Sequence, residues 1–178
     1  RDYYASRGLG DVYKRQYDMY LKLLGEAVSE EKGEAAQSAD LDCLIDISVN
    51  AHIPESYVES LTLRLDVYRR IADIRNKEDS LDVKDELKDR FGEIPESVLG
   101  LIDIALIRNC ANAMGIYEIR QTDTNVLLFV KEIKSPKVIE LLSRLNGRAM
   151  LSAGNKPYIT IRCGGGSSLD MLKKVFKI

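Results

Sequence analysis

Residues 95–115, PESVLGLIDIALIRNCANAMG, decide the fold of this chain of 178 residues. Pro95 suits the first turn of a helix, and Gly115 suits the position just past the end of one. Between them, apolar residues fall on nearly every face of a helix from Glu96 to Met114. A helix of this kind has to be covered on all sides. The stretch therefore predicts a central, buried helix, and its apolar positions are Val98, Leu101, Ile102, Ile104, Ala105, Leu106 and Ile107.

On the N-terminal side of this helix, the pattern predicts one strand and two further helices. Residues 43–50 alternate apolar and polar side chains, as in a strand with one buried face. We expect a long helix that begins at Pro54 and ends near Asn76. We expect a shorter helix after it, with Ser80 as the N-cap and Gly92 as the residue that ends it.

On the C-terminal side, the pattern predicts two β-hairpins, each followed by a helix. Turn-forming residues separate the paired apolar runs in both hairpins. The expected elements are strands 116–121 and 126–132, a helix over 136–145, strands 148–152 and 158–163, and a last helix capped by Ser167 or Ser168.

The element order predicts an α+β fold with a helical N-terminal half packed on a small mixed or antiparallel sheet. With a helix over residues 17–33, the full order is α-β-ααα-ββ-α-ββ-α. Residues 1–16 show no helical or strand period, so we expect an extraneous or disordered leader there. Residues 34–41 are small and polar, which is typical of a linker. The domain itself is expected to cover residues 42–178.

Composition excludes several classes of site. Lys plus Arg number 26 against 28 Asp plus Glu, so the net charge is −2 and the chain lacks the excess of positive charge of a dedicated nucleic-acid-binding domain. One histidine and three widely spaced cysteines form no metal-binding pattern, and we expect reduced, buried thiols in a cytoplasmic protein. No apolar run reaches the ~18 residues that a membrane span needs. We expect no metal, no cofactor, no membrane contact and a monomer.

Two features invite a catalytic or phosphate-binding interpretation. The glycine run 164–166 lies between a strand and a helix, where backbone N–H groups can bind a phosphate. The run lacks the lysine of a P-loop, so a flexible connection, with Ser167 and Ser168 beginning the helix, is favoured over a phosphate or nucleotide site. His52 has no neighbouring partner that would make it a general base. We therefore expect no catalytic residue.

Two groups of cations invite a DNA-binding interpretation. Four arginines lie on or near one predicted helix, but they spread around it and acidic residues interrupt them. A solvated face with i,i+4 pairs, such as Asp66 with Arg70, is favoured over a surface that follows phosphates. The last helix carries Lys173, Lys174 and Lys177, where cations also suit the negative helix end. The arginines are Arg64, Arg69, Arg70 and Arg75.

A mixed-charge cluster is the most informative polar feature of the chain. The segment ELKDRFG, residues 86–92, ends the helix that precedes Pro95. Glu86, Asp89 and Arg90 are spaced i, i+3 and i+4, so they share one face beside a buried stripe. Such a cluster is typical of a solvated helix end, or of a polar protein–protein contact in which charge sets specificity.

At these residues the sequence resembles the C-terminal domain of the bacterial transcription-repair coupling factors (the TRCF or Mfd family). The resemblance is specific from about Asp42 to Ile119 and weaker toward the C-terminus. Residues 17–28 are similar to the segment that leaves the translocase motor of that family. The resembling stretches are PESYV at 54–58, RLDVYRRIA at 64–72, ELKDRFGEIP at 86–95, MGI at 114–116 and KPYITIR at 156–162.

The resemblance implies a regulatory role. Members of this family are ATP-driven translocases on double-stranded DNA that displace stalled RNA polymerase and recruit UvrA. Their C-terminal domain packs on a UvrB-like N-terminal module of the same protein and masks its UvrA-binding surface. Carried over, this implies that Glu86, Asp89 and Arg90 contact that module. This chain contains no Walker A or other helicase motif, so we expect it not to be an enzyme by itself.

Overall fold

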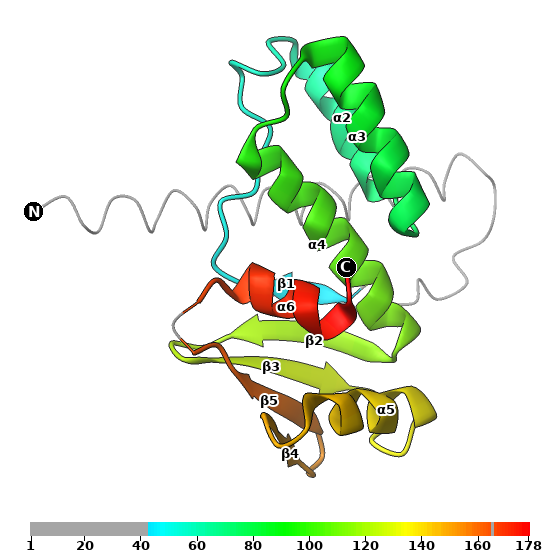
Figure 1. Cartoon of the computed structure of the whole chain (residues 1–178), viewed down its shortest axis with the longest axis vertical. Coiled ribbons are helices and arrows are strands. Elements are labelled where there is room, and N and C mark those ends of the chain that lie inside the picture. Colours follow the sequence, from blue (N-terminus) through cyan, green and yellow to red (C-terminus); the bar gives the residue numbers. More distant parts are fainter. Residues whose placement is uncertain (1–42, 165) are drawn as a thin grey trace, which may run out of the picture. The chain divides into compact units, whose positions relative to one another are not determined.

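The computed structural model describes residues 43–164 and 166–178 (Figure 1). The segments predicted as leader, first helix and linker, residues 1–16, 17–33 and 34–41, lie outside the described residues. Within the described part, five helices and a five-stranded mixed sheet follow one another in the order β-ααα-ββ-α-ββ-α. The prediction of an α+β fold is therefore confirmed.

The described residues form two compact units. Residues 49–106 make up a helical unit, and residues 43–48 with 107–178 make up a sheet unit. Helix α4, Glu96–Ala113, begins in the first unit and ends in the second. Gly115, with φ of +76°, follows its end, and its predicted apolar positions are all buried. The prediction of a buried helix in this stretch is confirmed.

Helix α2, Leu61–Ala72, begins later and ends earlier than the sequence pattern predicted. Pro54 opens a turn instead, because its carbonyl oxygen accepts hydrogen bonds from the backbone N–H groups of Tyr57 and Val58. The N-cap is Ser60, whose hydroxyl oxygen accepts from the Leu63 N–H at 3.4 Å. The expectation of a helix from Pro54 was wrong, since a proline suits the start of a turn as well as the start of a helix.

Helix α3, Lys77–Phe91, begins earlier than predicted. Asn76 is its N-cap: the Asn76 side chain accepts from the Asp79 N–H at 2.9 Å, and the Asp79 carboxylate accepts from the Asn76 N–H at 3.3 Å. This capping box satisfies two backbone donors that would otherwise lack partners. Ser80 lies inside the helix, buried, and donates to the Lys77 carbonyl. Its assignment as N-cap was wrong, while the end of the helix at Gly92 is confirmed.

The sheet has the strand order β1-β2-β3-β5-β4, with β1 parallel to β2 and every other pair antiparallel. Both predicted hairpins are present. The first strand is much shorter than predicted, although residues 43–48 keep the expected alternation of buried and exposed side chains. The strands are β1, Leu44–Asp46; β2, Ile116–Gln121; β3, Asn125–Val130; β4, Ala149–Ser152; and β5, Tyr158–Arg162.

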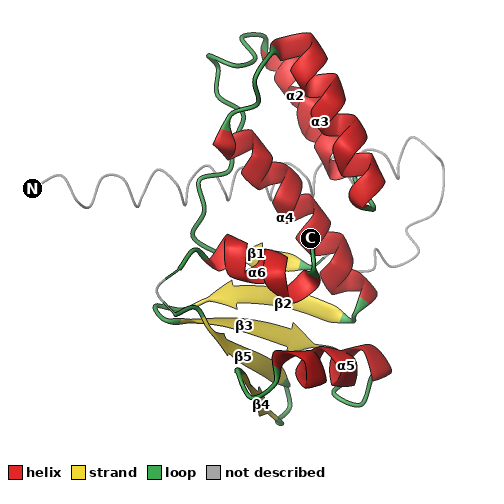
Figure 2. Cartoon of the chain, in the orientation of Figure 1, coloured by secondary structure: helices red, strands yellow, loops and turns green. Residues whose placement is uncertain are grey.

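Helices α5, Pro136–Leu145, and α6, Ser168–Phe176, lie in front of the strands in the view of Figure 2. The two helices bury their apolar sides, which carry Val138 and Leu141 on α5 and Leu172, Val175 and Phe176 on α6. The strands contribute alternate positions to the core, such as Val126, Leu128 and Val130. Period-2 strands and amphipathic helices therefore share one core in the sheet unit.

Candidate protein-interaction site

Helices α2 and α3 lie side by side in the helical unit, and an ionic bridge joins them (Figure 1). The Arg70 Nε atom lies 3.0 Å from Oε2 of Glu86, and the Arg90 Nη1 atom lies 2.8 Å from Oε1 of the same carboxylate. Both oxygens of Glu86 thus accept from guanidinium groups. The structure brings Glu86 and Arg90 together as predicted, but it commits Glu86 to contacts within the chain.

Arg90 is held in place from two directions. Besides its bond to Glu86, its guanidinium carbon lies 5.0 Å from the centroid of the Phe91 ring, within cation–π range. Phe91 in turn meets Tyr57 edge to face, with the ring centroids 5.8 Å apart. The Arg90 side chain remains 42% exposed, and its other N–H groups have no partner among the described residues. Arg90 is therefore an oriented cation at the surface.

Asp89 lies at the surface of the same turn. Its side chain is exposed, and within the described residues its carboxylate has neither a hydrogen bond nor an ion pair. Lys88 of α3 and Glu93 of the loop that follows form an ion pair of 3.3 Å. The end of α3 thus presents one carboxylate free to accept and one oriented guanidinium free to donate, which is the arrangement that a complementary charged surface would recognise.

Two residues that build this surface, Arg70 and Tyr57, were not predicted to belong to it. Arg70 was expected to pair with Asp66, but Asp66 pairs with Arg69 at 3.6 Å and Arg70 reaches across to α3. The Tyr57 hydroxyl donates to the carbonyl oxygens of Leu87 and Gly92, at 3.1 and 3.4 Å. Burial and the charge of Glu93 raise the pKa of Tyr57, so this donor stays protonated. No spacing along one helix could have shown either contact.

The bridge gives Glu86 a pH-dependent effect on stability. Hydrogen bonds from Arg70 and Arg90 lower the pKa of Glu86 below its ordinary value of 4.5, against the opposing effect of partial burial. The folded state therefore binds this proton more weakly than the unfolded state does. The resulting stabilisation is fully present above the ordinary pKa and is lost as the pH falls through the lowered one.

We expect Glu86→Gln to reduce the free energy of unfolding near neutral pH by roughly 0.5–1 kcal/mol, because both arginines are half-exposed and water screens the pairs. The difference between wild type and variant should shrink steadily in more acidic buffers. Urea unfolding of both proteins across a pH series measures it. A difference that stays constant with pH would show that the carboxylate charge contributes nothing.

The other features that the sequence singled out contribute no residue to this surface. The Nδ1 atom of His52 lies 2.9 Å from the Asn50 side-chain oxygen. In the glycine run, position 165 is outside the described residues, and the buried Ser168 hydroxyl lies 3.6 Å from the Cys163 sulfur. Arg64, expected in water, is only 13% exposed at its side chain and pairs with Glu55. All of these contacts are made between residues of this chain.

The cysteines correct one expectation. All three are free thiols, and Cys43 is buried, but Cys110 and Cys163 are half-exposed rather than buried. Burial nevertheless raises the pKa of Cys110, which favours the unreactive thiol. Over residues 43–164 and 166–178, no cluster of His, Cys, Asp and Glu has the composition to bind a metal ion. In the same residues, no helix has both the length and the apolar character of a membrane span.

Comparison with known proteins places this geometry in a family. Residues 47–140, which include all of α2, α3 and α4, match the model of the TRCF domain. The chain belongs to the TRCF family. A solved structure, the crystal structure of the C-terminal domain of a transcription-repair coupling factor, superposes on the TRCF chain described here with a TM-score of 0.67 at 18% identity. It covers 76% of this chain and 88% of that one, and shows the shared fold.

Full-length relatives are much longer than this TRCF chain. The transcription-repair-coupling factor of Bacillus subtilis (strain 168) is 30% identical over 165 residues, which cover 89% of this chain and 14% of that protein. The protein of the same name from Staphylococcus epidermidis (strain ATCC 12228) is 31% identical over 144 residues, or 75% of this chain and 12% of that protein. The chain therefore corresponds to a small part of each relative.

Proposed function

We propose that this TRCF domain is a regulatory latch in a bacterial transcription-repair coupling factor of the cytoplasm. In the whole protein, the end of α3 docks on a UvrB-like module of the same polypeptide and masks the surface that binds UvrA. The latch opens when the motor engages RNA polymerase on double-stranded DNA. The observation that carries the proposal is the exposed Asp89 carboxylate, which has no partner among residues 43–164 and 166–178, beside the oriented Arg90 guanidinium.

The contacts of the three predicted residues separate their roles. Asp89 and Arg90 keep hydrogen-bonding capacity for a partner, so they contact it. Glu86 uses both carboxylate oxygens on Arg70 and Arg90, so it acts as a positioning residue. Fixing the Arg90 side chain before docking reduces the entropy that docking costs.

A polar contact of this kind suits a latch within one chain. Interfaces between domains of one polypeptide typically bury ~600–1,500 Å² and are polar enough to open. Tethering supplies an effective concentration on the order of mM, so each contact can be weak. The domain then needs no catalytic group, and a monomer suffices.

We expect Asp89→Ala and Arg90→Ala, made in the full-length protein, to raise the apparent affinity for UvrA by about tenfold each. A charge-assisted hydrogen bond contributes roughly 1.5–3 kcal/mol. The apparent affinity of a mostly closed protein is its intrinsic affinity multiplied by the fraction that is open, so weakening the closed state raises it. Glu86→Gln should give a smaller gain, because it acts through Arg90. Titration of labelled UvrA by fluorescence anisotropy measures the three affinities.

Asp82→Ala is the matched control. Asp82 is an exposed acid on the same helix, about two turns before Asp89. The Asp82→Ala substitution removes the same charge at a position away from the end of α3, so the UvrA affinity should not change. Equal effects of Asp82→Ala and Asp89→Ala would mean that net charge, and not a contact of Asp89, determines the UvrA affinity. Unchanged affinity in the Asp89 and Arg90 variants would refute the latch.

A further inference from the structure

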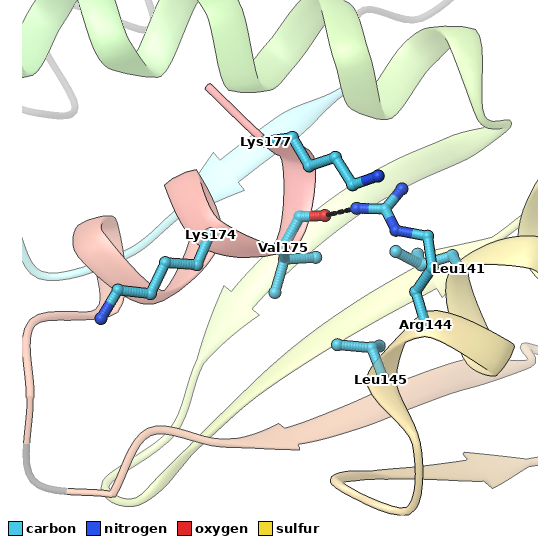
Figure 3. Close-up of a pocket in the computed structure, with 6 residues that line it drawn as sticks. All are labelled: Leu141, Arg144, Leu145, Lys174, Val175 and Lys177. Atoms are coloured by element: carbon cyan, nitrogen blue, oxygen red, sulfur yellow. Dashed lines mark hydrogen bonds between the residues drawn. The ribbon is translucent and has the colours of Figure 1, made fainter.

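A hollow of about 270 Å³ between α5 and α6 combines an apolar lining with positive charge (Figure 3). It lies in the sheet unit, whereas the residues of the latch proposal belong to the helical unit. Three of its lining residues are aliphatic, three are cationic and none is acidic. They are Leu141, Leu145 and Val175, with Arg144, Lys174 and Lys177.

Two of these cations face each other. The Nη2 atom of Arg144 donates to the Val175 carbonyl at 2.7 Å, which fixes the guanidinium at the last turn of α6. Figure 3 shows the Lys177 ammonium group turned toward this guanidinium and the Lys174 side chain pointing away. Within the described residues, neither Arg144 nor Lys177 forms an ion pair. The C-terminus of α6 supplies only about half a negative charge, so positive charge is in excess here.

A second hollow shares the lining residue Arg144 with the first. Its volume is about 300 Å³, and its lining includes Ala113 and Met114 at the end of α4. It also includes one acid, Glu140, so the two hollows together carry four cationic residues and one acidic residue. The Lys137 ammonium group donates to the Ala113 carbonyl at 2.6 Å on its border. The two hollows share Arg144, and we name them together the α5 groove. One small anion would occupy a single point of this groove, whereas an extended ligand fits both hollows.

We propose that the α5 groove binds an acidic segment of a partner protein. Carboxylates of that segment pair with Arg144 and Lys177, and apolar side chains on either side of them enter the two hollows. An aliphatic lining favours a peptide over a nucleic acid, because a phosphodiester backbone has no apolar group to bury there. This surface is additional to the latch at the end of α3, and neither proposal depends on the other.

The test uses this chain and two fluorescein-labelled peptides. In one peptide, pairs of glutamates alternate with leucines; in the other, glutamine replaces each glutamate. Fluorescence anisotropy should show saturable binding of the glutamate peptide and at least roughly tenfold weaker binding of the glutamine peptide. Lys177→Gln should weaken binding of the glutamate peptide roughly tenfold, and Lys174→Gln should weaken it less, because Lys174 points away.

Lys156→Gln is the control, since Lys156 is an exposed lysine of the sheet unit that lines neither hollow. It removes the same charge and should leave the affinity unchanged. Thermal unfolding of each variant shows that the fold is kept. Equal binding of the two peptides, equal effects of Lys156→Gln and Lys177→Gln, or no binding at all would overturn the proposal. A duplex oligonucleotide that binds more tightly than the peptide, and loses affinity in Lys177→Gln, would overturn it in favour of a nucleic-acid site.

Discussion

Replacing Leu101 with alanine is expected to lower the free energy of unfolding by about 2–5 kcal/mol. Leu101 lies on α4 with no exposed surface, in the stretch where the helix is apolar on all sides. Alanine removes three carbon atoms from a closely packed site. The loss combines the transfer free energy of those atoms with the cavity that remains, because the surroundings close only partly.

Leu81→Ala provides the matched control for this prediction. Leu81 also lies on a helix of the helical unit, but 52% of it is exposed. The same atoms are removed without leaving a cavity, so the change should stay within about 0.5 kcal/mol. Urea unfolding followed by circular dichroism gives both values. Similar losses in the two variants would mean that the all-round apolar pattern of α4 does not mark the core of this unit.

The same pattern explains why most of the fold could be predicted from the sequence. Each type of apolar pattern indicates which side of an element faces the core. A helix that is apolar all round is covered on every side, whereas a strand with period 2 or a helix with one apolar stripe buries one face. Helix ends were harder to predict, because several residues compete to cap them. Pro54 and Ser80 both carry start signals, yet Ser60 and Asn76 are the caps. The outcome depends on which side-chain oxygen reaches a free N–H group in the folded chain.

In the candidate site, contacts within one helix could be predicted from the sequence, whereas contacts between elements could not. The pairing of Glu86 with Arg90 follows from their i,i+4 spacing, because such residues are neighbours on any helix. The bridge from Arg70 to Glu86 depends on how α2 packs against α3, and the edge-to-face contact of Tyr57 with Phe91 depends on a loop. Sequence therefore predicts the cluster, while the structure shows that Glu86 is used in contacts within the chain and that Arg90 keeps part of its side chain exposed.

Gly92→Ala is expected to destabilise the protein by about 1–3 kcal/mol, even though a methyl group at this position would touch nothing within 4 Å. The cause is backbone conformation alone. Gly92 has φ of +83° and ψ of −155°, a region that only glycine adopts readily. This conformation lets the Gly92 N–H donate to Lys88 and the Gly92 carbonyl accept from Tyr57. Urea unfolding measures the loss, and the hydrogen exchange of amides in the last turn of α3 should rise with it.

Gly100→Ala is the control, and its effect should have the opposite sign. Gly100 lies inside α4, and an added methyl carbon would meet its nearest neighbour, the Asn50 carbonyl oxygen, at 3.6 Å, an ordinary contact distance. Alanine there restricts the unfolded chain and favours the helix, which should stabilise the protein by about 0.5–1 kcal/mol. If Gly92→Ala lowers the free energy of unfolding and Gly100→Ala raises it, the backbone angles of Gly92 are the reason that α3 ends there. If both variants lost stability equally, backbone strain could not be what fixes the position of Asp89 and Arg90.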